Sequence, residues 1–395
     1  MIGEKEKSQC CGCHACANRC PRHCISMEPD EEGFLYPTVH TEECIGCGLC
    51  ENVCPVTYKP ERENGLQAFA VYCTDEKIRA ESSSGGVFTL LAEAVLKENG
   101  VVFGAAFQDG CQVVHNSART KEAVSAFRGS KYVQSRLDNT YCEAMEYLDQ
   151  GRPVLYSGTP CQIAGLKGYL GKEYDNLLCQ DIVCHGVPSP KVWEKYVGEL
   201  EKKYGAPVQS VSFRNKAQGW KKYCIFIRFQ NGDSYSHCFS GDPYMKAFLA
   251  NLSLRPSCYC CAFKQNGETS DVTLADFWGV EEVLPEMDDD RGVSLLIIRS
   301  DKGKRYLEKI SRQIVRKEID LPKVIPYNPS IVESVRENPK RKAFFTELGQ
   351  TEMVTLAEKY CMEPYVKRAI DHLIAIGKSA ISRAAKRLRD IRREG

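Results

Sequence analysis

The sequence CCGCHACANRCP, residues 10–21, is followed by a second stretch of the same form, CIGCGLCENVCP, residues 44–55. Both stretches place their cysteines in the spacing CxxCxxCxxxCP. Residues 1–60 carry ten of the 22 cysteines and show little hydrophobic periodicity. A segment this short cannot fold on apolar burial alone, so we expect an inorganic group to hold it together.

This spacing is typical of bacterial ferredoxins, in which each run supplies three thiolates to one 4Fe–4S cluster and its fourth cysteine to the other. The pattern predicts one cluster bound by Cys10, Cys13, Cys16 and Cys54, and a second bound by Cys44, Cys47, Cys50 and Cys20. CxxC pairs also bind zinc, but two complete runs, each followed by proline, favour clusters. Cys11 and Cys24 fall outside the spacing, and we expect them to be packed side chains.

The composition narrows the class of protein. A formal net charge of +1 over 395 residues argues against a nucleic-acid-binding protein, which would need a strongly basic face. The N-terminal MIGEKEKSQCC has no apolar run, and no later stretch approaches the roughly 18 apolar residues of a membrane span. We therefore expect a cytoplasmic protein, in which many cysteines indicate metal binding rather than disulfides.

From Leu66 the sequence alternates between strand and helix patterns, which predicts an α/β fold, or a mixed α+β one, with a parallel or mixed sheet. Strands are expected in QAFAVY (67–72), VVFGAAF (101–107), RPVLYSG (152–158) and LLCQDIVC (177–184). Helices are expected after SSSGG (82–86) and in residues 159–171 and 189–205. The stretch 224–239 predicts a hairpin with a two-residue turn at Asn231 and Gly232. After residues 293–300 the pattern is helical to the end.

Three loops contain residues that commonly bind phosphate. The first, which leads into a helix, contains Ser83, Ser84, Gly85 and Gly86; the others contain Ser130 and Lys131, and Gly158 and Thr159. Three such loops fit a nucleotide lying across the edge of a sheet. The same residue types are also ordinary helix starts, and a lysine in a turn is usually solvated. Neither a GxGxxG motif nor a Walker P-loop is present, so a standard NAD or ATP site is not expected.

The motifs SSSGGVF, FRGSKYVQS, GTPCQIAGL, DIVCHGVPSP, SCYCCAF and DVTLADFWG follow one another behind the two cysteine runs. As a set they resemble the coenzyme F420 hydrogenase/dehydrogenase beta-subunit family. This resemblance implies a flavoprotein with FAD in the α/β domain. It also implies a third 4Fe–4S cluster at Cys161, Cys184, Cys258 and Cys261, with Cys260 as the spare thiol. Loops from one sheet edge can bring these four together, although Cys161 and Cys184 are alternatively buried apolar residues.

The resemblance also suggests the division of the chain. We expect a two-cluster ferredoxin-type domain at 1–60, the two parts of the beta-subunit-like domain at 61–150 and 151–330, and a helical extension at 331–395. The flavin and third cluster are expected in the second part. The basic amphipathic stretch at 365–395 predicts either a packed terminal helix or peripheral contact with a membrane.

A few residues near the expected third cluster have open roles. His185 follows Cys184 directly, where it can hydrogen-bond near a cluster, handle a proton at the flavin, or simply cap a loop. Asp276, Phe277 and Trp278 end a strand and are expected to pack around the cluster or flavin, or to be core residues. The sequence identifies no catalytic residue.

The predicted function follows from electron counting, because clusters transfer single electrons and a flavin converts between one- and two-electron steps. We expect an oxidoreductase that takes electrons from ferredoxin or a redox partner subunit and reduces a small-molecule acceptor. The acceptor is coenzyme F420-like, sugar-derived or another conjugated molecule, and the reverse electron flow is equally compatible. The alternative is an electron-transfer module that serves a partner protein and has no substrate of its own.

Overall fold

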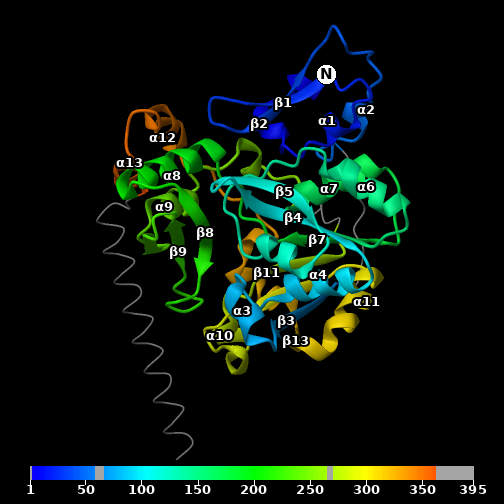
Figure 1. The fold of residues 1–395 in the computed structure, drawn as a ribbon, viewed down its shortest axis with the longest axis vertical. Helices are drawn as coiled ribbons and strands as arrows, with labels where there is room; N and C mark the ends of the chain where they lie inside the picture. Colours follow the sequence, from blue (N-terminus) through cyan, green and yellow to red (C-terminus); the bar gives the residue numbers. More distant parts are fainter. Residues whose placement is uncertain (1, 58–65, 265–269, 362–395) are drawn as a thin grey trace, which may run out of the picture.

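The computed structural model describes residues 2–57, 66–264 and 270–361. Its centre is an eight-stranded sheet with the order β13-β3-β12-β11-β7-β6-β4-β5 (Figure 1). In that order the strands are Ile314–Ile319, Gln67–Cys73, Ser294–Ile298, Val272–Asp276, Leu177–Ile182, Val154–Gly158, Val101–Gln108 and Gln112–Ala118. The four strands from β11 to β4 run parallel, and the outer pairs are antiparallel. The expected mixed α/β fold is confirmed.

Helices cover both faces of this sheet. Successive residues of its central strands point to opposite sides, so each face has apolar side chains to bury. Leu155 of β6 packs with α4 and α11, whereas the next residue, Tyr156, packs with α6 and α7. The four helices are Val87–Lys97 (α4), Asp301–Ile310 (α11), Thr140–Asp149 (α6) and Pro160–Leu170 (α7).

A second, antiparallel sheet with the order β10-β9-β8 lies beside the central one (Figure 1). It packs against four helices around an aromatic core that includes Trp193 and Phe213. These strands and helices are Val208–Asn215 (β8), Cys224–Phe229 (β9), Ser234–Cys238 (β10), Pro190–Tyr204 (α8), Pro243–Leu249 (α9), Arg341–Glu347 (α12) and Met353–Cys361 (α13).

The remaining elements of this part are short. The helices are Glu76–Glu81 (α3), Lys121–Val124 (α5) and Val280–Val283 (α10). Single 3-10 turns cover Ser125–Phe127, Pro256–Cys258, Pro285–Met287, Ser311–Gln313, Leu321–Lys323, Ile325–Tyr327 and Pro329–Ile331. Within the described ranges, no helix has the length and apolarity needed to cross a membrane.

Two expectations about local structure are wrong. The chain after residue 300 is not helical throughout, because Ile314–Ile319 forms the edge strand β13 beside β3. Its sequence IVRKEI carries three consecutive charges that resemble a helix surface, but charges also suit an exposed edge strand. The hairpin β9–β10 is confirmed, but its loop has three residues, 230–232, since the Phe229 N–H donates to the Asp233 carbonyl. Only Gly232 in this loop has a positive φ, of 93°.

The N-terminal residues form a small lobe at one end of the central sheet, next to α6 and α7 (Figure 1). Its helices are Ala15–Arg19 (α1) and Leu49–Asn52 (α2), its antiparallel hairpin is Ile25–Pro29 (β1) and Leu35–Val39 (β2), and its 3-10 turns are Ile2–Glu4 and Lys7–Gln9. Much of its buried interior consists of cysteine side chains. This composition agrees with the expectation that apolar burial alone does not stabilise the N-terminal segment.

Two glycines of α7 allow the N-terminal lobe to pack closely on the helix. A methyl group at Gly165 would lie 2.9 Å from the Cβ of Cys13 and 3.0 Å from its Sγ. A methyl group at Gly168 would lie 2.6 Å from the Val53 carbonyl oxygen. Both contacts are shorter than side chains tolerate, so any larger residue at either position would push the lobe away from α7.

Arg255 fixes the lobe from its other side. The side chain is fully buried, at 0% exposure. It donates from Nε to the Cys10 carbonyl over 2.7 Å and from Nη2 to the Leu35 carbonyl over 3.0 Å. Its Nη1 donates to Gln134 Oε1 of the α/β domain, and its guanidinium lies 4.1 Å from the centre of the Tyr36 ring. One side chain therefore joins the first cysteine run and the hairpin β1–β2 to the rest of the protein.

Replacing Arg255 tests this role. We expect Arg255→Met to cost about 2–4 kcal/mol, because it leaves the Cys10 and Leu35 carbonyls buried without donors. Thermal unfolding of the anaerobically prepared holoprotein measures the effect as a lower midpoint. The control is Arg136→Met, which removes a half-exposed arginine paired only with nearby Asp138. Equal midpoints for the two variants would contradict the role assigned to Arg255.

Candidate functional site

The thiols predicted for the second ferredoxin-type cluster lie together at the outer end of the lobe. A small cavity is lined by Cys20, Cys44, Cys47 and Cys50. Cys47 is exposed and Ile45 beside it is 64% exposed. Cys24, which we expected to be a packed residue, is buried and its Sγ lies 3.3 Å from that of Cys20. This group is the one that a protein in solution can approach.

The thiols predicted for the first cluster lie deeper, against the α/β domain. Burial, together with the neighbouring thiols of Cys10 and Cys54, raises the pKa of Cys16 to about 12. Arg255 donates to Cys10 Sγ over 3.5 Å and Lys5 donates to Cys54 Sγ over 3.2 Å. Positive donors on the sulfur atoms favour thiolates, the form in which cysteine binds iron.

Cys11 has a position that the spacing did not indicate. Its side chain is buried, and the thiols of Cys13 and Cys161 lie close enough to affect its pKa, which burial raises. Cys13 belongs to the inner ferredoxin-type group, whereas Cys161 lies in the first turn of α7, directly after β6. Cys11 is therefore a packed side chain, as expected, and it lies between two groups of thiols.

The four thiols implied for a third cluster also converge. Cys161 follows β6, Cys184 follows β7, Cys258 ends a 3-10 turn, and Cys261 comes three residues later. Burial raises the pKa of Cys184 to about 12; Lys264 opposes this rise, and the thiols of Cys161 and Cys261 add to it. Burial likewise raises the pKa of Cys258, with contributions from the thiols of the other three. Four thiols buried near one another are the donor set that a 4Fe–4S cluster requires.

The remaining thiol of this stretch, Cys260, points elsewhere. It is exposed, and its Sγ lies 3.5 Å from the carbonyl oxygen of Ser8. In the described part of the chain, no three His, Cys, Asp or Glu side chains are placed to share a single metal ion. A cluster has a different requirement, because each cysteine binds its own iron.

A cavity of about 510 Å³ opens at the carboxyl ends of the parallel strands. It is lined by the ends of β6, β7 and β11, at Gly158, Ile182 and Asp276, and by Cys184 of the third thiol group. This edge of an α/β sheet is where ligands usually bind. A second cavity of about 300 Å³ shares Ser83, Lys131 and Arg214 with the first. Together they offer an extended space that begins beside a group of thiols.

Seven of the eight residues predicted to bind a cofactor line the larger cavity, namely Ser83, Ser84, Gly86, Ser130, Lys131, Gly158 and Thr159. The eighth, Gly85, lies behind them, because a Cβ there would be 2.3 Å from the Val71 carbonyl oxygen. The Ser83 hydroxyl lies 2.9 Å from that of Ser130 and accepts from the Ser130 N–H, which joins two of the loops. Thr159 forms a capping box with Gln162 at the start of α7.

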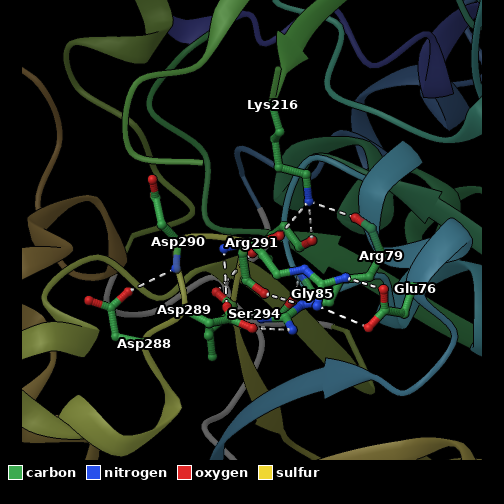
Figure 2. A network of polar contacts seen from close by, with 12 residues as sticks. Glu76, Arg79, Gly85, Lys216, Asp288, Asp289, Asp290, Arg291 and Ser294 are labelled. Atoms are coloured by element: carbon green, nitrogen blue, oxygen red, sulfur yellow. Dashed lines mark hydrogen bonds and ion pairs between the residues drawn. The ribbon is translucent and has the colours of Figure 1, made fainter. Parts of the chain in front are cut away.

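Lys216 fixes the loop at 82–86 by hydrogen bonds to backbone carbonyls (Figure 2). Its Nζ donates to the carbonyls of Arg79, Ser84 and Arg291 over 2.6, 2.9 and 2.8 Å. Arg79 in turn makes two hydrogen bonds to the Asp289 carboxylate (Figure 2). Burial lowers the pKa of Lys216 to about 8. These bonds tie the loop at 82–86 to the segment at 289–294 and give it one fixed conformation.

Lys131 differs from the solvated lysine that a turn usually carries. Its Nζ donates to the carbonyls of Ala126 and Arg128 over 2.8 and 3.0 Å. The loss of hydration lowers the pKa of Lys131 to about 7. An anion in the cavity would favour its protonated form, so Lys131 is placed to respond to a charged ligand.

Three residues with unpartnered polar atoms line the cavity, and none of them was predicted. Among the described residues, the buried atoms without a hydrogen-bond partner include His115 Nδ1, Arg214 Nε and Asn328 Nδ2. Burial lowers the pKa of His115 to about 4, so its ring is neutral; its Nε2 donates to the Ser157 carbonyl, which leaves Nδ1 as an acceptor. These three side chains line the cavity, and their unpartnered atoms lie buried beneath its surface. They come from separate strands and loops, and no local spacing links them.

The other residues considered near the third thiol group have clear surroundings. His185 lines the cavity and bonds Asn251 through Nε2 over 2.7 Å, and burial lowers its pKa. Asp276 pairs with Arg214 through both oxygens and accepts from Trp220 Nε1. Trp278 stacks on Trp220 and lines the cavity, whereas Phe277 is a core residue. The basic stretch at 365–395 lies outside the described residues.

Comparison with known proteins identifies the family of the chain. Two family models described as coenzyme F420 hydrogenase/dehydrogenase, beta subunit, match the chain. The model of the N-terminal part of that family matches residues 68–140, and the model of its C-terminal part matches residues 151–322. A 4Fe-4S dicluster domain model matches residues 9–58. Among curated proteins, none matches the chain.

One solved structure that matches the chain is described as a xenon derivatization of the F420-reducing NiFe hydrogenase complex from Methanosarcina barkeri. It is 15% identical, with 76% of this chain and 91% of that chain covered and a TM-score of 0.43.

The two ferredoxin-type cysteine runs and the mixed α/β domain behind them define an iron–sulfur electron-transfer protein. The chain belongs to the coenzyme F420 hydrogenase/dehydrogenase beta-subunit family, a family of oxidoreductases.

Proposed function

We propose that this protein is an iron–sulfur flavoprotein oxidoreductase. On this account two ferredoxin-type clusters and a third 4Fe–4S cluster, bound by Cys161, Cys184, Cys258 and Cys261, connect a soluble electron carrier to FAD in the large cavity. The substrate is a small organic acceptor, coenzyme F420-like, sugar-derived or another conjugated molecule; the family description names coenzyme F420 for its members.

The observation that carries this proposal is the order of the thiol groups. The outer group contains the exposed Cys47, and the inner group contains Cys13. Cys11 lies close to both Cys13 and Cys161 of the third group, and Cys184 of that group lines the cavity. Thiols thus follow one another without a gap from the surface to the ligand site. An electron carrier that served only a partner would need the N-terminal lobe and no such cavity.

The residues of the cavity suit FAD. The loops at 82–86 and 129–131 and the N-terminus of α7 supply hydroxyl and N–H donors for a diphosphate. Tyr223 and Trp278 add aromatic surface to the cavity wall for a flat ring system such as an isoalloxazine. Bound there, FAD would exchange single electrons with the clusters and electron pairs with the acceptor.

Aromatic residues of the cavity wall suit a planar acceptor. Tyr223 and Trp278 both line the cavity and both lie against the Arg214 guanidinium, at 3.9 and 5.1 Å from their ring centres. Asp276 holds this arginine in place through two hydrogen bonds. Rings fixed in this way offer stacking surface at little entropic cost.

The outer thiol group suits a redox partner. Ile45 is an exposed apolar side chain beside the exposed Cys47, so a docking protein would cover it while approaching the cluster ligands. Ferredoxin or a partner redox subunit fits this role, and the family description, which names a beta subunit, supports a multi-subunit setting. The proposal places the protein in the cytoplasm, where the cysteines that bind no cluster would stay reduced.

Substituting the third group tests the proposed cluster. We expect Cys258→Ser to lower the iron content of anaerobically prepared protein from about twelve to about eight atoms per chain, because one cluster is lost and two remain. Iron assay and EPR spectroscopy of the reduced protein measure this change.

The neighbouring Cys260 provides a matched control, since it is exposed and lies outside the group. Cys260→Ser should keep about twelve irons per chain. A Cys258→Ser variant with undiminished iron, or a Cys260→Ser variant with an equal loss, would refute the third site.

The pKa of Lys131 predicts a pH dependence of FAD binding. Below pH 7 the ammonium group is charged and attracts the diphosphate; as pH rises above 7 it loses its proton and affinity falls. We expect the Kd to rise by up to about tenfold per pH unit in the range above pH 7. Fluorescence titration of FAD into flavin-depleted protein between pH 6 and pH 8.5 measures it.

Lys131→Met should bind FAD weakly at every pH and lose this dependence. Lys121→Met removes an exposed lysine that pairs with Glu93, and it should behave like the unchanged protein. If Lys131→Met kept the wild-type pH profile, Lys131 would have no part in binding the diphosphate.

A further inference from the structure

The hairpin β9–β10 brings together two cysteines that have no place among the three thiol groups. In the antiparallel register of these strands, Cys224 lies opposite Cys238. Their Sγ atoms are 3.1 Å apart. They are fourteen positions apart in the sequence, so only the register of the hairpin reveals the pair.

The backbone at this position suits a covalent link. The next pair toward the strand ends is hydrogen-bonded, because the Phe239 N–H donates to the Tyr223 carbonyl. Since hydrogen-bonded and non-hydrogen-bonded pairs alternate, Cys224 and Cys238 form a non-hydrogen-bonded pair. Such pairs have Cα atoms about 4.5 Å apart, within the range that a disulfide spans.

The two thiols differ in their access to solvent. Cys238 is partly exposed, and its Sγ also lies 3.1 Å from Gln218 Oε1. Cys224 is buried, at 2% exposure. Burial raises the pKa of Cys224 to about 11, and the hydrogen bond with Cys238 contributes. A reagent from solution therefore meets Cys238 first, and Cys224 lies directly behind it.

We propose that Cys224 and Cys238 form a reversible disulfide when the protein meets a low-molecular-weight disulfide. The Cys238 thiolate attacks one sulfur of the reagent, forming a mixed disulfide and releasing one thiolate. The Cys224 thiolate then attacks the Cys238 sulfur, forming the intramolecular bond and releasing the second thiolate. Two electrons pass from the cysteine pair to the reagent, and the two released thiolates take up the two cysteine protons.

The position of this pair connects it to the cavity. Tyr223, which lines the cavity, directly precedes Cys224, and Phe239, which directly follows Cys238, stacks on Tyr223 at 4.6 Å between ring centres. Oxidation would tie the two strands together beside this part of the cavity wall. Disulfides in reducing compartments are mostly transient and responsive to redox conditions, which fits a reversible bond at this site.

Peptide mapping tests the proposal directly. The anaerobically prepared holoprotein is incubated with oxidised glutathione, quenched in acid, alkylated with N-ethylmaleimide and digested with trypsin. Cleavage after Lys222, Arg228 and Lys246 puts the two cysteines on separate peptides, 223–228 and 229–246, with no other cysteine on either. We expect these two peptides to be recovered mainly as one disulfide-linked species, with unchanged iron content, and to separate after dithiothreitol.

Variants sharpen the test. In Cys224→Ser, Cys238 should stop at the mixed disulfide with glutathione, whereas Cys111→Ser should leave the linked species unchanged. Recovery of the two peptides as separately alkylated species would overturn the proposal. A linked species that forms only as iron is lost would also overturn it, because it would report damage to the clusters rather than a reaction of the intact protein.

Discussion

The close packing of Cys13 against Gly165 is the contact on which the rest of the structure depends. Because Gly165 has no side chain, the inner cysteine group can approach the first turns of α7, where Cys161 lies. Cys11 is buried beside them, close to the thiols of both Cys13 and Cys161. The buried Arg255 fixes the lobe in this position through the carbonyls of Cys10 and Leu35. The N-terminal lobe is thus a fixed part of the protein and not a tethered appendage.

This arrangement explains why the fold places its site where it does. The parallel strands β6 and β7 end at the same edge of the sheet, and each is followed by a cysteine, Cys161 or Cys184. The same strand ends line the cavity. A single feature, the common edge of parallel strands, therefore supplies both the ligand space and half of the thiols beside it.

The sequence predicted most of what is locally encoded. Residues close together in the sequence set the cysteine spacing within Cys10–Cys54. They also set the strand pattern around Leu155 and the helix pattern around Val87, so these features could be inferred. The contributions of His115 and Arg214 could not, because they come from strands that meet only in the folded protein. The edge strand β13 was missed because Arg316, Lys317 and Glu318 suit an exposed strand as well as a helix.

The Cys224–Cys238 pair shows what an error of one residue in the predicted length of a turn changes. A two-residue turn at Asn231 and Gly232 would have placed Cys224 opposite Phe239. The observed three-residue loop shifts the register by one residue and places it opposite Cys238. Turn length decides register, and register decides which side chains meet.

The central claim is that three clusters and a flavin form one connected path. Full anaerobic reduction followed by EPR spin integration and flavin absorbance tests it most directly. The account predicts about three cluster spins per chain, broadened by mutual interaction, together with a bleached flavin. About two spins per chain with no flavin absorbance would contradict it.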